Sequence, residues 1–226
     1  MPKRAARSTS TTKRIYLVED HPTFRQGLTQ ILNKTGDLAI CGAAEDFNSA
    51  LRGIRKSKPD LVLIDITLPG KSGLELVKRL HKSAQKLKLL VLSMHDEALY
   101  ADRVLRAGGD GYIMKQEDPE EIVHAIRDVL AGHVYVSEAV FAERAQSSKK
   151  PSRTKKQQAF DDLTDQELEV LAMLGQGKNA SQIARQLKLS VKEIEALGLA
   201  MRRKLDLSTS LALVRYAVCW VETGET

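Results

Sequence analysis

The sequence predicts an α/β fold with a five-stranded doubly wound parallel sheet, followed by a small all-α domain of four helices. Three observations predict it. Between residues 14 and 132, short apolar runs alternate five times with amphipathic stretches of helical spacing. The apolar runs are nearly continuous, as in strands that are covered on both faces. From residue 161 onward the pattern is helical, with short turns between the helices.

The first domain is expected to contain five strand–helix units. The expected strands cover residues 14–20, 38–44, 61–65, 89–94 and 111–115. The expected helices cover residues 22–34, 47–57, 73–83, 98–108 and 119–132. In the first helix, for example, Phe24, Leu28, Ile31 and Leu32 share one face, and Pro22 suits the first turn. Because strands and helices alternate, the sheet is parallel, and ligands bind at the carboxyl ends of its strands.

Polar side chains stand at those carboxyl ends. Glu19 and Asp20 end the first strand, Asp65 ends the third, Ser93 lies in the fourth, and Lys115 follows the fifth. Three carboxylates at one rim repel one another unless a hard divalent cation joins them, and oxygen ligands suit Mg²⁺. A carboxylate so placed can attack a phosphoryl group while the metal and the lysine neutralise the developing charge.

The stretches that carry these residues resemble the receiver domain of two-component response regulators, which has a flavodoxin-like fold. They are VEDHPTFRQGL, DLVLIDITLPGKSGLEL, VLSMHDE and AGGDGYIMKQ, and the match runs from residue 14 to about 132. The resemblance implies that Asp65 accepts phosphate from a sensor histidine kinase. It also implies that Glu19, Asp20, Asp65 and the backbone carbonyl of Thr67 hold Mg²⁺.

The same resemblance assigns the phosphate-binding and switch residues. Ser93 and Tyr112 are the expected switch pair, in which the hydroxyl turns toward the phosphoryl group and the ring follows inward. Lys115 is the expected phosphate-binding lysine. Many receivers have proline after this lysine, whereas this chain has Gln116.

Two histidines adjoin the expected pocket, and phosphate relay or metal binding is one interpretation of them. We expect His21 instead to open the first helix ahead of Pro22. His95 gives no further signal, so neither histidine is predicted to be catalytic.

The net charge of +6 comes from two segments that look unfolded. Residues 1–14 carry five basic side chains and no acidic one, and residues 143–160 carry six basic and one acidic. Residues 15–142 and 161–226 each have a small acidic excess. We therefore expect a disordered tail at 1–14, a receiver at 15–142, a flexible linker at 143–160 and a second domain at 161–226. The two basic segments would supply any long-range attraction to nucleic acid.

The chain is expected to be cytoplasmic and to have no contact with membranes. No apolar run approaches the roughly 18 residues of a membrane-spanning helix, and no apolar core follows the basic N-terminus. Cys41 and Cys219 lie far apart in apolar surroundings, which predicts buried thiols in a reducing compartment.

Three capping patterns mark helix starts in the second domain. They are Thr164 with Glu167, Asn179 with Gln182, and Ser190 with Glu193. Gly175 and Gly177 are expected to end the first helix, and a fourth helix should run from about 209 to 221. The short segment between the second and third helices fits a helix-turn-helix unit.

The segments LTDQELEVL, GQGKNASQIARQL, RRKL and LALVRYA resemble the LuxR-type output domain over about residues 162–218. With a receiver in front, the whole chain resembles a response regulator of the LuxR/FixJ (NarL-like) family. The resemblance implies a transcription factor that is switched by phosphorylation and that dimerises on phosphorylation or on DNA. It does not imply an enzyme, apart from Mg²⁺-dependent self-phosphorylation and dephosphorylation.

The third helix of this domain is the expected DNA-reading helix, but its outward residues are unusual. Its expected contacts with promoter DNA are Lys192, Glu195, Ala196, Leu199, Arg202, Arg203 and Lys204. Base edges are mostly read by Arg, Lys, Asn and Gln, whereas Glu195 brings an anion and Gly198 weakens the helix by about 1 kcal/mol relative to Ala. Two interpretations stay open: DNA binding with an altered code, or a protein-interaction module whose outward face meets another chain.

Overall fold

The computed structural model describes residues 12–69, 71–83, 86–94, 97–138, 140–142, 159–160 and 162–223. Most of the expected tail at 1–14 and of the expected linker at 143–160 lies outside these residues, as does His95. The first strand begins at Lys13, so Lys13 and Arg14 belong to the sheet and not to the tail. Phe160, at the end of the expected linker, is buried.

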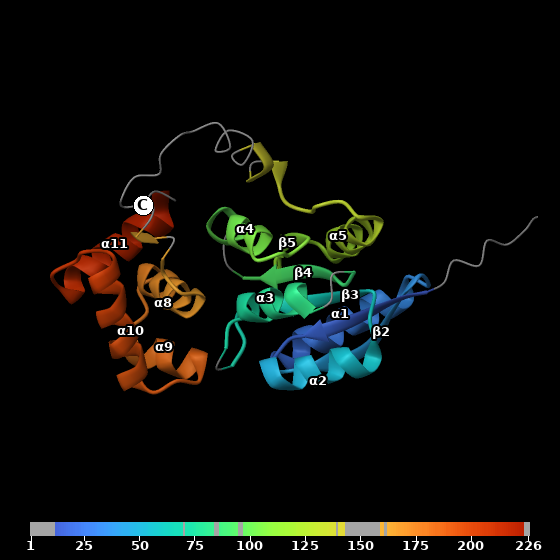
Figure 1. Cartoon of the computed structure of the whole chain (residues 1–226), viewed down its shortest axis with the longest axis horizontal. Helices are drawn as coiled ribbons and strands as arrows, with labels where there is room; N and C mark the ends of the chain where they lie inside the picture. Colours follow the sequence, from blue (N-terminus) through green and yellow to red (C-terminus); the bar gives the residue numbers. More distant parts are fainter. Residues whose placement is uncertain are drawn as a thin grey trace, which may run out of the picture.

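The α/β domain contains a five-stranded parallel sheet with helices on both faces (Figure 1), which confirms the predicted fold class. Its strands are β1 (Lys13–Val18), β2 (Leu38–Ala44), β3 (Leu61–Asp65), β4 (Lys88–Ser93) and β5 (Gly111–Met114). Its helices are α1 (Pro22–Lys34), α2 (Phe47–Ser57), α3 (Gly73–Ser83), α4 (Glu97–Arg106) and α5 (Pro119–Ala131). The strand order is β2-β1-β3-β4-β5, so the order reverses between β1 and β3.

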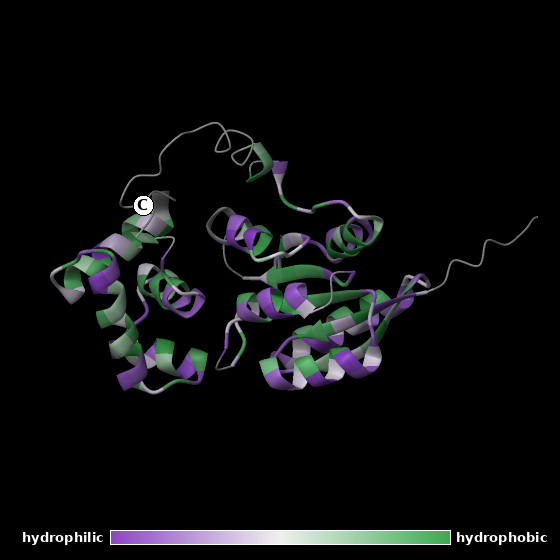
Figure 2. Ribbon diagram, viewed as in Figure 1, coloured by the Kyte–Doolittle hydropathy of each residue, from purple (hydrophilic) through white to green (hydrophobic). Residues whose placement is uncertain are grey.

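Alternation along each strand divides the core into two layers. In β1, Ile15 and Leu17 face the cluster that α1 and α5 cover. Tyr16 and Val18 face the other cluster, which α2, α3 and α4 cover. The strands are accordingly apolar inside and the helices polar outside (Figure 2).

The described residues from 162 to 223 contain four helices, as predicted for the second domain. They are α8 (Asp165–Gly175), α9 (Ala180–Leu187), α10 (Val191–Lys204) and α11 (Ser210–Thr223). All three predicted capping boxes are present, at the starts of α8, α9 and α10. Helix α8 ends at Gly175, and Gly177 has a φ of 79°, which favours glycine.

Both cysteines are more exposed than the sequence predicts, so the prediction of two buried thiols is wrong. Cys41 is half-buried because β2 is an edge strand of the sheet. Cys219 is exposed because it points away from the face of α11 that buries Ala217 and Trp220. Among the described residues no helix is both long and apolar enough to span a membrane.

The helical domain packs beside α3 and α4 of the α/β domain through polar contacts (Figure 1). Lys78 Nζ of α3 lies 2.9 Å from Asp165 Oδ2 at the start of α8. Arg103 of α4 donates to the carbonyl oxygens of Phe160 and Leu163, at 2.7 and 2.9 Å. These contacts hold the two domains together on the side of the sheet where β3 and β4 end.

Candidate functional site

Asp65 ends β3, and its side chain is buried beside Lys115, which follows strand β5. The carboxylate is 2% exposed. Lys115, which follows β5, places its Nζ 2.7 Å from Asp65 Oδ2 and 2.6 Å from Glu19 Oε2. One ammonium therefore compensates two buried carboxylates. The parallel strands bring these residues together because their carboxyl ends meet at one edge.

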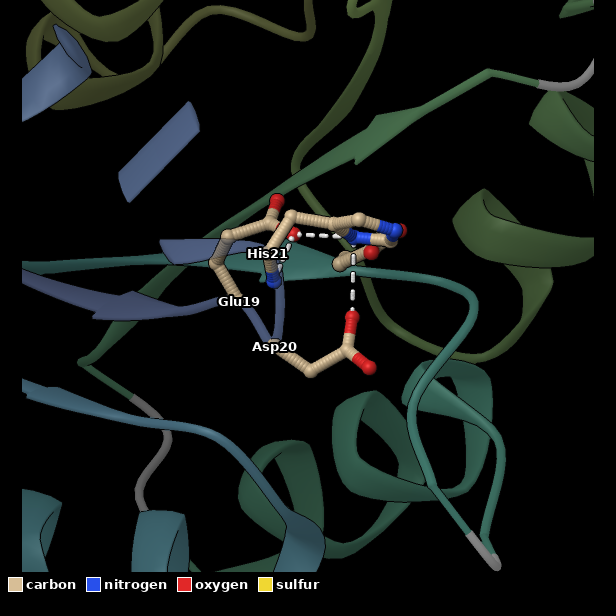
Figure 3. Close-up of side chains that lie close together, drawn as sticks. Glu19, Asp20 and His21 are labelled. Atoms are coloured by element: carbon tan, nitrogen blue, oxygen red, sulfur yellow. Dashed lines mark hydrogen bonds and ion pairs between the residues drawn. The ribbon is translucent and has the colours of Figure 1, made fainter. Parts of the chain in front are cut away.

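Glu19, Asp20 and His21 form the second half of the site, in the turn between β1 and α1 (Figure 3). His21 Nδ1 lies 2.9 Å from Glu19 Oε1 and 2.9 Å from Asp20 Oδ1. Ligand atoms of Glu19, Asp20, His21 and Asp65 all lie within 4.8 Å of one another. His21 is also the residue that precedes α1, as expected from the sequence, although its ring takes part in the cluster.

The electrostatics of the cluster are those of buried carboxylates that need positive charge. Burial raises the pKa of Asp65 to about 7, and while the charge of Lys115 opposes the rise, that of Glu19 adds to it. Burial alone would lower the pKa of Lys115, but the charges of Asp65 and Glu19 outweigh it, so this pKa is raised. Lys115 thus contacts two of the three carboxylates of the site, and the third, Asp20, has no contact with it.

The three carboxylates suit a small divalent cation. Their oxygens converge from one turn and one strand end, and Mg²⁺ is bound by one or two carboxylates and a few further oxygens. Thr67 stands two residues beyond Asp65, and its backbone N–H donates to Asp65 Oδ1 at 3.1 Å. The donor set therefore fits the cation that the sequence suggested.

The expected switch residues lie on the neighbouring strands, Ser93 at the end of β4 and Tyr112 near the start of β5. Ser93 and Tyr112 are fully buried. The backbone N–H of Lys115 donates to the carbonyl oxygen of Ser93 at 2.8 Å, which fixes the turn after β5 against the end of β4. The ring of Tyr112 already occupies the inward position in this structure.

The outward face of α10 is placed as the sequence predicts. Lys192, Glu195, Ala196, Leu199 and Arg203 are exposed. Leu199 is 42% exposed, so its apolar side chain is accessible on this face.

Two basic residues near the end of α10 are engaged within the helical domain. Lys204 Nζ lies 2.7 Å from Glu167 Oε2 and donates to the carbonyl oxygen of Asp162 at 3.1 Å. The DNA contact expected of Lys204 does not fit this arrangement, because its ammonium compensates a buried glutamate. Arg202 is partly buried and donates to the carbonyl oxygen of Ser208 at 3.3 Å.

Two residues of the helical domain reach the acidic pocket, and neither contact was predicted from the sequence. Lys188 Nζ lies 3.2 Å from Asp20 Oδ2. Glu169 of α8 is buried and forms a hydrogen bond with the side chain of Thr67. Burial raises the pKa of Glu169 to about 8, and the nearby Asp65 adds to the rise while the bond with Thr67 opposes it. An acidic residue amid the apolar face of α8 was the one available hint.

Comparisons with known proteins match both domains of the chain to known families. Residues 15–127 match the response regulator receiver domain, and residues 161–217 match the bacterial regulatory proteins of the luxR family. The response regulator UvrY of Escherichia coli is 30% identical over 92% of this chain and 97% of its own length. The oxygen regulatory protein NreC of Staphylococcus haemolyticus is 32% identical over 91% of this chain and 96% of its own length.

A solved structure is also similar to this chain. A two-component response regulator of the LuxR family from an Aurantimonas species is 34% identical, with a TM-score of 0.57, over 62% of this chain and 100% of that one. The two family matches follow each other along the chain in the order of the two domains described above. The chain therefore belongs to the LuxR family of response regulators, which are transcription regulators built from a receiver domain and a helix-turn-helix output domain.

Proposed function

We propose that Asp65 is the phosphoacceptor and that it takes its phosphoryl group from a sensor histidine kinase. An oxygen of Asp65 attacks phosphorus, the bond from phosphorus to the kinase histidine nitrogen breaks, and the nitrogen keeps the electron pair. The observation that carries the proposal is the buried Asp65 carboxylate with Lys115 Nζ at 2.7 Å, beside further carboxylates within metal-binding distance. We propose no catalytic activity beyond this self-phosphorylation and its hydrolytic reversal.

Mg²⁺ would be held by Glu19, Asp20, Asp65 and the backbone carbonyl of Thr67. When bound, it supplies positive charge for the oxygens of the transferred phosphoryl group. The protein itself contributes the ammonium of Lys115. It contacts the Asp65 carboxylate and can instead contact an oxygen of the phosphoryl group after the transfer.

Ser93 and Tyr112 would transmit the structural effect of phosphorylation from the pocket to the rest of the domain. Ser93, at the end of β4, can donate its hydroxyl hydrogen to a phosphoryl oxygen. Tyr112 lies on the adjacent strand, paired with Val91, so a shift at the end of β4 reaches its ring directly.

Labelling with a small phosphodonor tests the acceptor. Incubation with acetyl phosphate and Mg²⁺ should label the protein once, and Asp65→Asn should abolish the label. Asp20→Asn should slow labelling through the metal, whereas Glu120→Gln, at an exposed acid on α5, should not change it. Labelling that survives Asp65→Asn places the acceptor elsewhere and refutes the proposal.

We also propose that α10 binds promoter DNA. Ala196 and Leu199 would contact thymine methyl groups, Glu195 would accept from a cytosine amino group, and Lys192 and Arg203 would bind phosphates. The family of the output domain and the exposure of these side chains support the proposal. The exposed Leu199 equally suits a second candidate function, the binding of another protein by the same face.

A charge reversal separates the two candidates. If Glu195 faces the major groove, Glu195→Lys should tighten non-specific DNA binding, because an anion near phosphates becomes a cation. Asp162→Lys makes the same charge change outside α10 and measures the effect of net charge alone. Equal DNA affinities for the two variants would favour the protein-binding function.

Dimerisation on phosphorylation or on DNA is proposed from the family, and α11 offers a surface for it. Leu211 is 69% exposed and Val214 is also exposed, on the side of α11 away from Trp220. Sedimentation with and without the phosphodonor should show a dimer only when Asp65 is phosphorylated or DNA is present. Leu211→Glu should keep the protein monomeric.

A further inference from the structure

The docked output domain supplies a cation to the pocket where a metal would bind. Lys188 and Asp20 are 168 residues apart in the sequence, and Lys188 Nζ lies 3.2 Å from Asp20 Oδ2. The other oxygen of Asp20, Oδ1, faces His21 Nδ1 at 2.9 Å. Both carboxylate oxygens of Asp20 therefore have a nitrogen beside them in this structure.

Asp20 is the carboxylate of the cluster that depends on this contact. Lys115 lies within 2.7 Å of both Asp65 and Glu19. Among the described residues, Asp20 has its lysine contact with Lys188 and not with Lys115. Its side chain is 15% exposed, so solvent replaces a missing cation only in part.

Lys188 is held in place by the turn of the helix-turn-helix unit. It ends α9 in the left-handed region, with a φ of 55°, and its backbone N–H donates to carbonyl oxygens of α9. Ser190, two residues later, caps α10. The ion pair of Lys188 with Asp20 therefore joins the segment just before α10 to the acidic pocket.

We propose that Lys188 and the divalent cation compete for Asp20, so that cation binding and the docking of the helix-turn-helix unit oppose each other. An ammonium beside Asp20 lowers the affinity of this carboxylate for a metal ion, because the two positive charges would lie within a few ångströms of each other. Lys115 belongs to the same domain as the metal site, whereas Lys188 reaches Asp20 from the docked helical domain. In the docked form Lys188 stands where the cation needs Asp20. The proposal rests on the metal site of the proposed function.

Of the described contacts between the two domains, the ion pair of Lys188 is the one that occupies an oxygen of Asp20. The contacts of Lys78 with Asp165 and of Arg103 with Phe160 lie outside the pocket and leave Asp20 free. Glu169 reaches Thr67 from α8 and takes neither oxygen of Asp20, so it does not take part in this competition. A test must therefore isolate Lys188 from the rest of the interface.

The direct test measures the reactivity of lysine side chains in the full-length wild-type protein. Mg²⁺ alone is titrated without phosphodonor while a brief pulse of an amine-acylating reagent labels exposed lysines, which mass spectrometry then counts. Labelling of Lys188 should rise by up to about fivefold with Mg²⁺, the range of an exposed ion pair. Lys178 and Lys192, on the same domain, are internal controls and should keep constant labelling. In Asp20→Asn, Lys188 should react fast with or without Mg²⁺.

Calorimetric titration gives the reciprocal measurement. Lys188→Gln should bind Mg²⁺ between about 1.5-fold and fivefold tighter than the wild type. Arg215→Gln removes one positive charge from α11 and should leave the affinity unchanged. Equal Mg²⁺ affinity in Lys188→Gln and wild type, or constant Lys188 labelling while Mg²⁺ binds, overturns the competition but keeps the metal site. Absence of Mg²⁺ binding in every protein overturns the metal site as well.

Discussion

The guanidinium of Arg103 donates a hydrogen bond of 2.7 Å to the backbone carbonyl oxygen of Phe160, across the boundary between the two domains. It also lies over the Phe160 ring, 5.3 Å from its centre. Phe160 in turn packs against Trp220, with ring centres 5.0 Å apart. One arginine of α4 thus holds Phe160 and, through it, the core of the helical domain.

Arg103→Ala should loosen the docked arrangement, because buried carbonyl oxygens lose their donors at a cost of about 1–3 kcal/mol. The radius of gyration from small-angle scattering should increase, while each domain keeps its own unfolding transition. Arg79→Ala, an exposed arginine on the neighbouring helix α3, is the matched control. An unchanged radius would show that the contact of Lys78 with Asp165 suffices for docking.

Lys115→Ala should lower the free energy of unfolding of the α/β domain by about 3–5 kcal/mol, because two buried carboxylates lose their counter-charge. Urea unfolding measures the loss. Adding Asp65→Asn to this variant removes one of the two charges and should restore part of the stability. Additive effects of the two substitutions would mean that Lys115 and Asp65 are not energetically coupled.

Gly198→Ala should stabilise the helical domain by about 0.5–1 kcal/mol, since alanine is the better helix former. There is room for the new methyl group, because the nearest side-chain atom, on Leu213, would lie 3.9 Å away. Thermal unfolding checks the gain. A loss of DNA affinity in this more stable variant would show that the DNA backbone needs the close approach that glycine allows.

Asp37→Asn should lower stability at neutral pH but not at low pH. Arg127 donates to both oxygens of Asp37 at 2.9 Å and holds the pKa of that carboxyl at about 2. The folded state thus favours the charged form, so the contribution is present above the unfolded-state pKa near 4 and is lost as the pH falls through about 2. Because the pair is half exposed, we expect about 1 kcal/mol or less. Urea unfolding at pH 7 and pH 2.5 should show the difference between the two proteins shrinking.

The fold could be predicted from the sequence because its signals are local. Apolar runs gave the strands, and reciprocal pairs such as Ser190 with Glu193 gave the helix starts. The convergence of Glu19, Asp20 and Asp65 followed from the geometry of parallel strands. The prediction was less good at segment ends, where Phe160 was placed in the linker although it packs against Trp220.

The docking of the two domains could not be predicted, because its contacts join residues with no shared pattern. Nothing near Lys188 indicates that it faces Asp20, and the acids of α8 pair with residues far away in the sequence, such as Lys78 for Asp165. Lys204 shows the same limit inside one domain. Its place in a basic run suggested DNA, whereas its buried partner Glu167 decides its position.

In α10, the residues that fix the position of the helix are different from the residues that face outward. Ser190 and Glu193 fix where the helix begins, and Ile194 and Met201 fix its rotation against the domain. Substitutions at 195, 196 and 199 are therefore nearly free of folding constraint. These outward residues can change during evolution, or be exchanged for those of another regulator, while the helix and the core of its domain keep their structure.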